Sequence, residues 1–420
     1  MDMKFIFDIQ RFAFAGGSGS ANNPYIIKTA AQLRELANNV SNWSYAQAHY
    51  KLDADIDCST LDNFTPIGTA NNPFKGTFDG NGHTISNLKI AAGTYEGLFG
   101  YTEGATIQNV TVSNITTQTY DGNNQYVGGI ASYAKNSTFE NCIVESGTIT
   151  GNGSANLGGI VGYVFVNDGT TASEKGKARS LIQECQVKSA VQITPANSWV
   201  NSAGGIVGNA EVTSRQPCVG WSDFSVYLCD SNATFNFSSN SATTGGIIGK
   251  LTPKVLTNAQ NLTVFYNIGV HDSFFGGNTS SNNNDFASIV GTVNFPESKY
   301  IRSLGEEGSP LRLNGNYYYS ASGNELNTAS NVADHVSESK KPARLYKISV
   351  PEGIKISDVK DATKTFDGNG YATQDATVTF KLSAADSNCI IYGDLDLGSA
   401  TYYEGTYTAK ISKDDEDQLY

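Results

Sequence analysis

The sequence predicts an all-β protein: a right-handed parallel β-helix (solenoid) with an N-terminal helical cap, followed by a small β-sandwich domain. Three observations support this prediction. A short Gly-rich apolar motif recurs six times, and a second apolar motif follows each of its first five copies. The 420 residues include 43 glycines, and only 16% of them are charged. A chain rich in Gly, Asn, Ser and Thr with so little charge is typical of short strands joined by turns.

The first motif places glycines at equivalent positions of successive repeats. Its copies are EGLFG (96–100), GGIAS (128–132), GGIVG (158–162), GGIVG (204–208), GGIIG (245–249) and ASIVG (287–291), and the repeat glycines are Gly97, Gly129, Gly159, Gly205 and Gly246. A single unit of this size cannot bury its apolar face, whereas stacked units bury a continuous core. We expect the glycine pairs to allow a tight corner before each following strand.

The second motif places one small apolar residue per repeat in a single column. Its copies are IQNVTV (107–112), FENCIV (139–144), IQECQV (182–187), VYLCDS (226–231) and FYNIGV (265–270), and the column is Val110, Cys142, Cys185, Cys229 and Ile268. Because valine and isoleucine exchange with cysteine there, we expect a structural interior ladder of buried free thiols. Stacked neighbours close enough to form a disulfide are the open alternative.

The ends of the repeat region have their own signals. Thr29 precedes the segment 30–40, whose apolar residues have helical spacing and predict the cap. Charge rises before residue 345, and short strand patterns separated by turn signals follow it. We therefore predict four parts: a leader or disordered segment (1–21), the β-helix (22–330), a linker (331–344) and a small β-sandwich module (345–420).

The repeats, together with FTPIG and FKGTFDGNGHTISNL in the segment 64–88, resemble the GLUG-motif repeats of bacterial surface and secreted proteins. The resemblance covers roughly residues 22–325. It implies an extracellular, adhesin-like parallel β-helix, and its right-handedness agrees with the general rule for parallel crossovers. Some members of the family precede a metallopeptidase domain. None of the four histidines lies in an HExxH motif, so we do not transfer that activity.

Charge and hydropathy exclude several classes of partner. The net charge of -12 disfavours nucleic acid, because phosphate binding needs a basic surface. No apolar run approaches 18 residues, so we predict no membrane span. The N-terminal segment is not a typical signal peptide, because polar residues break its apolar stretch. We predict an extracellular or cell-surface location with an unidentified export route, and no cofactor.

Extra length enters each later repeat at one corner, between the two motifs. Insertions on one face of a repeat protein often form its binding face. These segments, which we call the loop wall, are 163–181, 209–225, 250–263 and 292–314, and they are basic compared with the whole chain. An aromatic side chain among polar groups can stack on a sugar, and basic groups can bind uronate or sulfate. The candidate ligand-binding residues are Trp221, Arg215, Lys175, Lys177, Arg179, Lys254, Tyr300 and Arg302. The alternative is that these loops only cover the solenoid, with Trp221 filling a gap beneath them.

Asp53, Asp55 and Asp57 alternate with small or apolar residues, so we expect a strand with three carboxylates on its outer face. Three carboxylates in a row are a candidate site for a hard cation. The segment lacks the glycine and the distal glutamate of an EF-hand loop. The alternative is the solvated face of a half-buried strand.

Together these patterns predict a non-catalytic surface protein, an adhesin or display stalk that binds an acidic glycan along the loop wall. Its partners would be a host or environmental glycan or a surface protein. We assign no catalytic residue. One alternative is a β-helix polysaccharide lyase or glycoside hydrolase, since such enzymes share the fold, although fold alone does not establish an activity. The other is a purely structural stalk.

Overall fold

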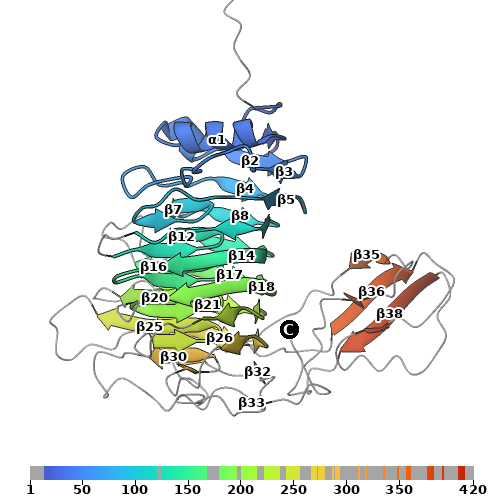
Figure 1. The fold of residues 1–420 in the computed structure, drawn as a ribbon. Coiled ribbons are helices and arrows are strands. Elements are labelled where there is room, and N and C mark those ends of the chain that lie inside the picture. Colours follow the sequence, from blue (N-terminus) through green and yellow to red (C-terminus); the bar gives the residue numbers. More distant parts are fainter. Residues whose placement is uncertain are drawn as a thin grey trace, which may run out of the picture.

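The chain forms a stack of parallel β coils, as the computed structural model shows (Figure 1). The structure describes residues 14–120, 124–167, 179–195, 200–214, 222–236, 243–255 and 266–271, and shorter stretches between 273 and 411. A complete coil contains four strands. One coil, for example, consists of β11 (Tyr126–Gly128), β12 (Ala131–Lys135), β13 (Thr138–Glu140) and β14 (Ile143–Gly151).

Each of the four positions in a coil builds its own parallel sheet. The nine-stranded sheet contains, in order, β1 (Tyr25–Ile27), β2 (His49–Leu52), β4 (Thr77–Asp79), β8 (Thr106–Gln108), β13, β17 (Arg179–Gln183), β21 (Ser222–Tyr227), β26 (Tyr266–His271) and β31 (Leu311–Arg312). The twelve-stranded sheet follows β3 (Ile56–Asp57), β5 (Thr84–Ser86), β9 (Thr111–Ser113), β14, β18 (Gln186–Pro195), β22 (Asp230–Ser231), β27 (Phe274–Phe275), β32 (Tyr317–Tyr318) and β33 (Asp334–His335). Its side branches are β10 (Ile115–Thr116), β23 (Thr234–Phe235) and β28 (Asn278–Thr279).

Two six-stranded sheets complete the coils on either side of the glycine corner. We call them the pre-corner and post-corner sheets. The pre-corner sheet contains β6 (Tyr95–Glu96), β11, β15 (Asn156–Gly158), β19 (Ser202–Gly204), β24 (Thr243–Gly245) and β29 (Phe286–Ala287). The post-corner sheet contains β7 (Phe99–Glu103), β12, β16 (Val161–Asn167), β20 (Val207–Ser214), β25 (Ile248–Val255) and β30 (Val290–Val293).

The repeat glycines are required by close packing between coils. A Cβ added at Gly159 would lie 2.0 Å from the carbonyl oxygen of Gly205, and one added at Gly205 would lie 2.0 Å from that of Gly246. Gly97 and Gly129 have equivalent approaches of 2.5 and 2.4 Å to the backbone of the next coil. The obstacle is backbone, which cannot move aside as a flexible side chain can. The predicted corner is therefore present, between the pre-corner and post-corner sheets.

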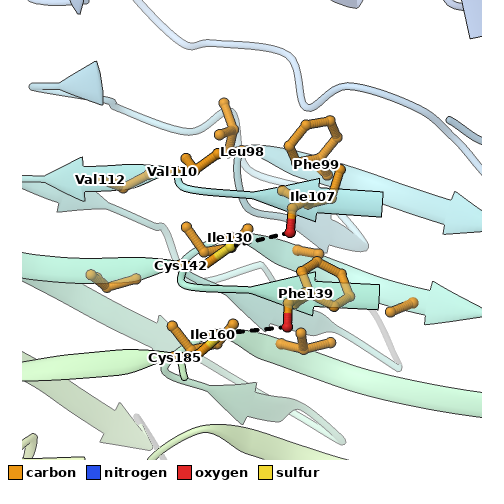
Figure 2. Packing of buried hydrophobic residues seen from close by; sticks show 14 of the residues in the cluster. Leu98, Phe99, Ile107, Val110, Val112, Ile130, Phe139, Cys142, Ile160 and Cys185 are labelled. Carbon is orange, nitrogen blue, oxygen red and sulfur yellow. Dashed lines mark hydrogen bonds between the residues drawn. The ribbon is translucent and has the colours of Figure 1, made fainter. Parts of the chain in front are cut away.

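The interior ladder is confirmed for four of its five predicted members. Val110, Cys142, Cys185 and Cys229 are fully buried, and Figure 2 shows the first three one above another. The thiols of Cys142 and Cys185 donate to the carbonyls of Ile107 and Phe139, at 3.5 and 3.7 Å. All four described cysteines, the fourth being Cys58, are free, so the disulfide alternative is not observed among them.

Ile268 is not a member of this ladder. The register pairs Ile268 with Phe224, and Val270 with Val226, one column earlier in the coil. The residue below Cys229 is Ser273, whose hydroxyl accepts from the Cys229 amide at 3.2 Å. The alignment that placed Ile268 in the ladder is therefore five residues too early, since the ladder position is Ser273. The column of Phe224 and Ile268 and the ladder column both hold apolar residues once per coil, so the two were confused.

The N-terminal end of the stack carries two helices, α1 (Ala30–Asn39) and α2 (Trp43–Ala46). The Thr29 side chain accepts from the Gln32 amide, as expected of an N-cap residue. Leu33, Leu36 and Ala37 of α1 are buried in the same apolar cluster as the coils. Figure 1 shows α1 at the blue end of the stack.

Two of the predicted boundaries are wrong. Phe14 lies within the predicted leader (1–21), yet it is buried and its ring packs on Tyr25 and Tyr50. The Ala15 amide also donates to the Ile26 carbonyl at 2.8 Å, so the folded part begins before residue 22. At the other end, β33 pairs in parallel with β32, which extends the solenoid sheet into the predicted linker (331–344).

The C-terminal part contains antiparallel strands. β35 (Ile356–Lys360), β36 (Ala376–Leu382) and β38 (Gly405–Ile411) form one sheet, and β34 (Ile348–Ser349) pairs with β37 (Ile390–Ile391). This change from parallel to antiparallel pairing separates the region from the solenoid. The sandwich arrangement of these strands stays a prediction.

Candidate binding surface

The predicted loop wall lies mostly outside the described residues. Trp221, Arg215, Lys175, Lys177, Tyr300 and Arg302 all fall there. Arg179 is described: it is exposed, begins β17 and lies in register with Asp223. Lys254 belongs to β25 and pairs with Thr213 of β20.

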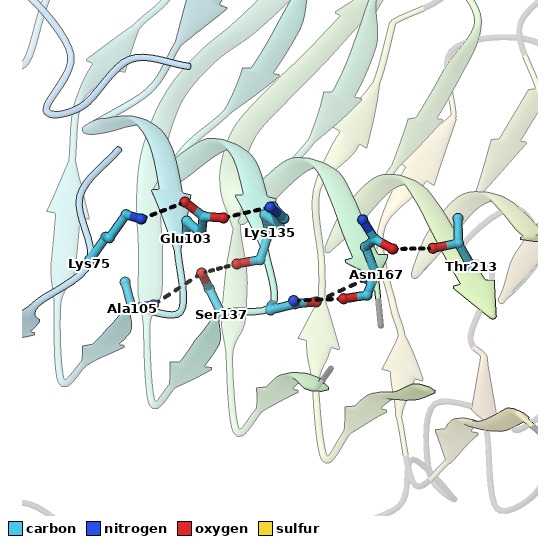
Figure 3. Close-up of polar contacts among 8 residues, drawn as sticks. Lys75, Glu103, Ala105, Lys135, Ser137, Asn167 and Thr213 are labelled. Carbon is cyan, nitrogen blue, oxygen red and sulfur yellow. Dashed lines mark hydrogen bonds and ion pairs between the residues drawn. The ribbon is translucent and has the colours of Figure 1, made fainter. Parts of the chain in front are cut away.

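Part of the wall is strand rather than loop. β16, β20 and β25 extend beyond the shorter strands of earlier coils, and their register continues through Asn167, Thr213 and Lys254. The Thr213 hydroxyl donates to the Asn167 side-chain oxygen at 3.2 Å, which ties these extensions together (Figure 3). The extra length therefore begins as longer strands of the post-corner sheet, at the ends that lead towards the nine-stranded sheet.

The row Asp53, Asp55 and Asp57 does not form a cation site. Among the described residues, no group of three or more His, Cys, Asp or Glu side chains is arranged to hold a metal ion. Nor do the three residues share one strand: Asp53 and Asp55 lie in the corner between β2 and β3, and only Asp57 lies in β3. All three side chains are exposed, as expected.

Each of these carboxylates has its own protein partners. Asp53 pairs with Lys28 at 2.6 Å, Asp55 accepts from the Thr84 amide at 3.0 Å, and Asp57 accepts from the Asn87 side chain at 2.8 Å. These bonds hold the pKa of each carboxyl below its usual value. The observed arrangement is thus a solvated corner tied to neighbouring coils.

Five tyrosines form a surface that the repeat motifs did not predict. We call it the tyrosine strip. It comprises Tyr95 and Tyr126 of the pre-corner sheet and Tyr101, Tyr133 and Tyr163 of the post-corner sheet. All five are half-buried, at positions that alternate with interior residues. The strip therefore follows the outside of the glycine corner over successive coils.

The rings of the strip lie in two perpendicular sets. Tyr101, Tyr133 and Tyr163 stack face to face, with centroids 4.5 and 5.0 Å apart, close to the strand spacing. Tyr95 and Tyr126 are nearly parallel to each other, with centroids 5.5 Å apart. Both meet Tyr133 at right angles, at 6.3 and 5.2 Å. Such edge-to-face contacts are favourable for aromatic pairs.

The strip ends in polar side chains that occupy the same two columns. Asn156 follows Tyr126 in register, and Asn209 follows Tyr163. The Asn156 side-chain oxygen accepts from the Ser202 hydroxyl at 2.9 Å and from the Asn209 amide at 3.3 Å. Asn209 is only 8% exposed, and its own side-chain oxygen has no hydrogen-bond partner within the described part of the chain.

Charged residues border the strip. Glu211 accepts from the Tyr163 hydroxyl at 2.8 Å. Burial, with the Glu211 charge as the next cause, raises the pKa of Tyr163 and Tyr126, so both phenols remain protonated donors. Glu103 pairs with Lys75 at 2.8 Å and with Lys135 at 2.5 Å, which Figure 3 shows as one line across the coils.

One carboxylate inside the stack is unusual. Glu96 occupies the interior column that holds Val127 in the next coil, and it is fully buried. It accepts from the Gly93 amide, the Gln118 amide and the Gln125 side chain, at 3.0, 2.6 and 2.9 Å. Burial nevertheless raises its pKa to about 7. Glu96 thereby joins the start of its own coil to the loop that leads into β11.

Sequence reasoning missed the strip for an identifiable reason. The search followed the apolar interior columns, whereas the strip depends on the residues between them. The signal is nevertheless present: Tyr95 directly precedes EGLFG, and Tyr126 stands two residues before GGIAS. Tyr101, Tyr133 and Tyr163 directly follow their copies of the motif.

Two curated proteins are similar to parts of the chain. "Halomucin" of Haloquadratum walsbyi is 32% identical over 173 residues, which is 37% of this chain and 2% of that protein. A "Putative Gly-rich membrane protein" of Evansella cellulosilytica is 39% identical over 108 residues, which is 24% of this chain and 12% of that protein. The matches thus span a small part of either relative. These relatives indicate a surface or membrane-associated protein.

No known family profile matches the chain. Among solved structures, a "putative immunoglobulin A1 protease from Bacteroides ovatus" is similar, with a TM-score of 0.48 and 19% identity, over 75% of this chain and 81% of that one. A likeness at this level supports no inference about activity. No helix among the described residues is long and apolar enough to cross a membrane.

Proposed function

We propose that the protein is a non-catalytic surface protein, an adhesin or display stalk on the outside of a bacterial cell, built from GLUG-type repeats. The observation that carries the proposal is the continuous parallel register of the coils. Both six-stranded sheets pair without interruption from one coil to the next, so the coils add up to a rod. A rod holds whatever it displays away from the surface that anchors it.

The two curated relatives support the surface location. One is described as a halomucin and the other as a Gly-rich membrane protein. The excess of acidic residues, a net charge of -12, fits a solvated extracellular surface. Helix α1 would cap the first coil, since it buries Leu33 and Leu36 beside the end of the stack.

Within this role, the loop wall remains our proposed contact for acidic glycans. Arg179 supports the proposal, because it is exposed at the point where the wall joins the nine-stranded sheet. Lys254 belongs to one of the longer post-corner strands next to it. Basic side chains on an otherwise acidic chain would attract uronate or sulfate groups to this side.

The test is light scattering on the full chain mixed with acidic and neutral polysaccharides and separated by size. We expect co-elution with an acidic polymer whose own mass stays unchanged. The double variant Arg179→Ala/Lys254→Ala should weaken the complex, whereas Lys89→Ala, an exposed lysine of an earlier coil, should not. Loss of polymer mass would overturn the non-catalytic assignment and favour a lyase or hydrolase. An absence of complexes with any polymer would leave only the structural stalk.

A further inference from the structure

We propose that Trp43 and the lysine beside it, Lys75, form a sugar-stacking site for a uronate-containing glycan at the N-terminal end of the rod. The inference rests on the proposed function and deepens it, because this site lies on the same corner of the solenoid as the loop wall. An acidic glycan held by the wall would have a second, aromatic contact in the early coils.

A line of polar side chains marks this corner, which lies between the post-corner sheet and the nine-stranded sheet. In the early coils the corner is a short turn. Glu103 and Lys135 are the last residues of β7 and β12, and Lys75 lies beside Glu103 in the first coil. Figure 3 shows these three side chains in one row with Asn167, which belongs to the first segment of the loop wall.

The line continues coil by coil into the loop wall. The Asn136 side chain donates to the Asn167 carbonyl and accepts from the Asn167 amide, both at 3.0 Å. Asn167 pairs in register with Thr213, and Thr213 pairs with Lys254. Lys75 and Lys254 are therefore five coils apart, which is about 24 Å at the spacing of parallel strands. An extended glycan that follows this corner would reach both ends of the line.

Trp43 supplies the aromatic surface at the start of the line. It begins α2 and is 69% exposed, against 38% for Tyr120, the other exposed large apolar side chain described. The Lys75 ammonium lies over its ring, 5.9 Å from the ring centroid. A ring with so much exposed surface does not have both faces packed, so one face is open to the flat apolar side of a sugar.

The line carries a positive charge beside that ring. Glu103 pairs with both Lys75 and Lys135, at 2.8 and 2.5 Å, so two ammonium groups share one carboxylate and the three side chains have a net charge of +1. The lysine side chains are 33% and 28% exposed, and ion pairs this exposed to water are weak. The carboxylate of a sugar stacked on Trp43 would therefore bind the Lys75 ammonium.

The combination of ring and lysine selects the class of ligand. An exposed tryptophan alone accepts sugars of any charge, and it also attracts cations. Lys75 repels a cationic ligand and attracts an anionic one, because like charges at this distance disfavour each other. A uronate, which combines a flat apolar face with a carboxylate, satisfies both residues, whereas a neutral sugar uses only the ring.

The test is biolayer interferometry of the full chain on immobilised polygalacturonate and on immobilised neutral galactan. The variants are Trp43→Ala and Lys75→Gln, and the matched control is Tyr120→Ala, which removes the other exposed aromatic. A local readout is the tryptophan emission of the wild type and of Trp43→Phe during titration with trigalacturonate, since the chain has only three tryptophans. Circular dichroism confirms that each variant folds.

We expect the wild type and Tyr120→Ala to bind polygalacturonate equally, and Trp43→Ala and Lys75→Gln to bind it at least about tenfold more weakly. Trigalacturonate should change the emission of the wild type but not that of Trp43→Phe. Unchanged affinity of Trp43→Ala would overturn the site, as would an equal emission change in Trp43→Phe. Binding to galactan as tight as to polygalacturonate would overturn the assignment of a uronate.

The double variant Arg179→Ala/Lys254→Ala separates this site from the loop wall. If it binds polygalacturonate weakly while Trp43→Ala binds like the wild type, the site is wrong and the proposed function stands. If it binds like the wild type while Trp43→Ala binds weakly, the site stands and the loop wall is wrong. A wild type that binds no acidic polymer would overturn both.

Discussion

Gly159 shows how closely consecutive coils approach at a single residue. An added Cβ there would lie 2.0 Å from the Gly205 carbonyl oxygen, which belongs to the backbone of the next coil. We expect Gly159→Ala to lower the free energy of unfolding by about 3 kcal/mol or more, because two coils must separate to admit one methyl group. Urea denaturation followed by circular dichroism measures the change.

The matched control is Gly93→Ala. Nothing lies within 4 Å of a Cβ added at Gly93. The variant also keeps the hydrogen bond that the backbone amide of residue 93 donates to the Glu96 side chain. We expect a change within about 0.5 kcal/mol. Equal stability of the two variants would mean that the coils do not pack at the distance observed.

Glu96 makes stability depend on pH. Its pKa is raised to about 7 in the folded protein from 4.5, so between these values the folded state holds a proton that the unfolded state has lost. Its contribution is therefore most favourable below pH 4.5 and is lost as the pH rises towards 7. The loss is at most about 3 kcal/mol, and less where water reaches the carboxylate.

The measurement is the free energy of unfolding of the wild type and of Glu96→Gln, from pH 4.5 to pH 8. In Glu96→Gln, the side-chain NH2 group of the glutamine must face at least one of the three N–H donors that the carboxylate oxygens accept from. This donor–donor contact lowers the stability of the variant by an amount that does not depend on pH. We expect the difference between the two proteins to change across this interval and to level off above it. A constant difference would show that Glu96 is ionised throughout.

At the scale of the element, a ladder of asparagines fixes one corner of each early coil. Asn109 and Asn141, which precede the interior ladder, have positive φ values of 53° and 49°. The Asn141 amide donates to Asn109 at 3.0 Å, and the Asn109 amide donates to Asp79 at 3.0 Å. Asparagine tolerates a positive φ better than most other residues apart from glycine.

We expect Asn109→Ala to destabilise the protein by about 2 kcal/mol, since it loses both the ladder bonds and the tolerance of positive φ. Asn109→Gly separates the two causes, because glycine keeps the backbone conformation and loses only the bonds. Thermal unfolding of both variants measures this. If Asn109→Ala and Asn109→Gly destabilise the protein equally, the positive φ at residue 109 contributes nothing to the loss of stability.

Later coils hold the same corner with less suitable residues. Glu184 and Leu228 occupy it with φ values of 55° and 51°. We expect Glu184→Asn to raise the free energy of unfolding by up to about 1 kcal/mol, because it relieves backbone strain directly below Asn141. The readout is the urea midpoint, with Glu145→Asn as a control at a residue of negative φ. A lowered midpoint for Glu184→Asn would mean that the glutamate's own contacts outweigh the strain.

Interior positions of the strands were easier to predict from the sequence than outward-facing positions. The interior column from Val110 to Cys229 was readable, because burial restricts it to small apolar residues. The same rule failed at Ile268, where two adjacent columns accept the same residue types. The asparagine corner and the tyrosine strip escaped prediction, because both consist of residues outside the apolar interior columns that the repeat alignment followed.

At the scale of the whole molecule, the parallel register that makes a rod also creates exposed edges. β1 is the terminal strand of the nine-stranded sheet, and an uncovered edge offers unpaired backbone groups to another chain. Helix α1 buries Leu33 and Leu36 next to this end. The proposed surface role requires that rods remain separate at high local density, which gives the helix a function beyond local stability.

The last prediction concerns this cap. Leu33→Ser/Leu36→Ser removes the apolar face of α1 and should loosen the helix, at a cost of about 2–5 kcal/mol for each leucine. If α1 shields the first coil, the variant should form assemblies larger than the wild type while its far-ultraviolet circular dichroism still shows the β-sheet. Light scattering measures the mass. Arg34→Ser, on the exposed face of the same helix, is the control and should elute like the wild type. A Leu33→Ser/Leu36→Ser variant that keeps both its β-sheet signal and the wild-type mass would show that the end of the stack is protected by other means.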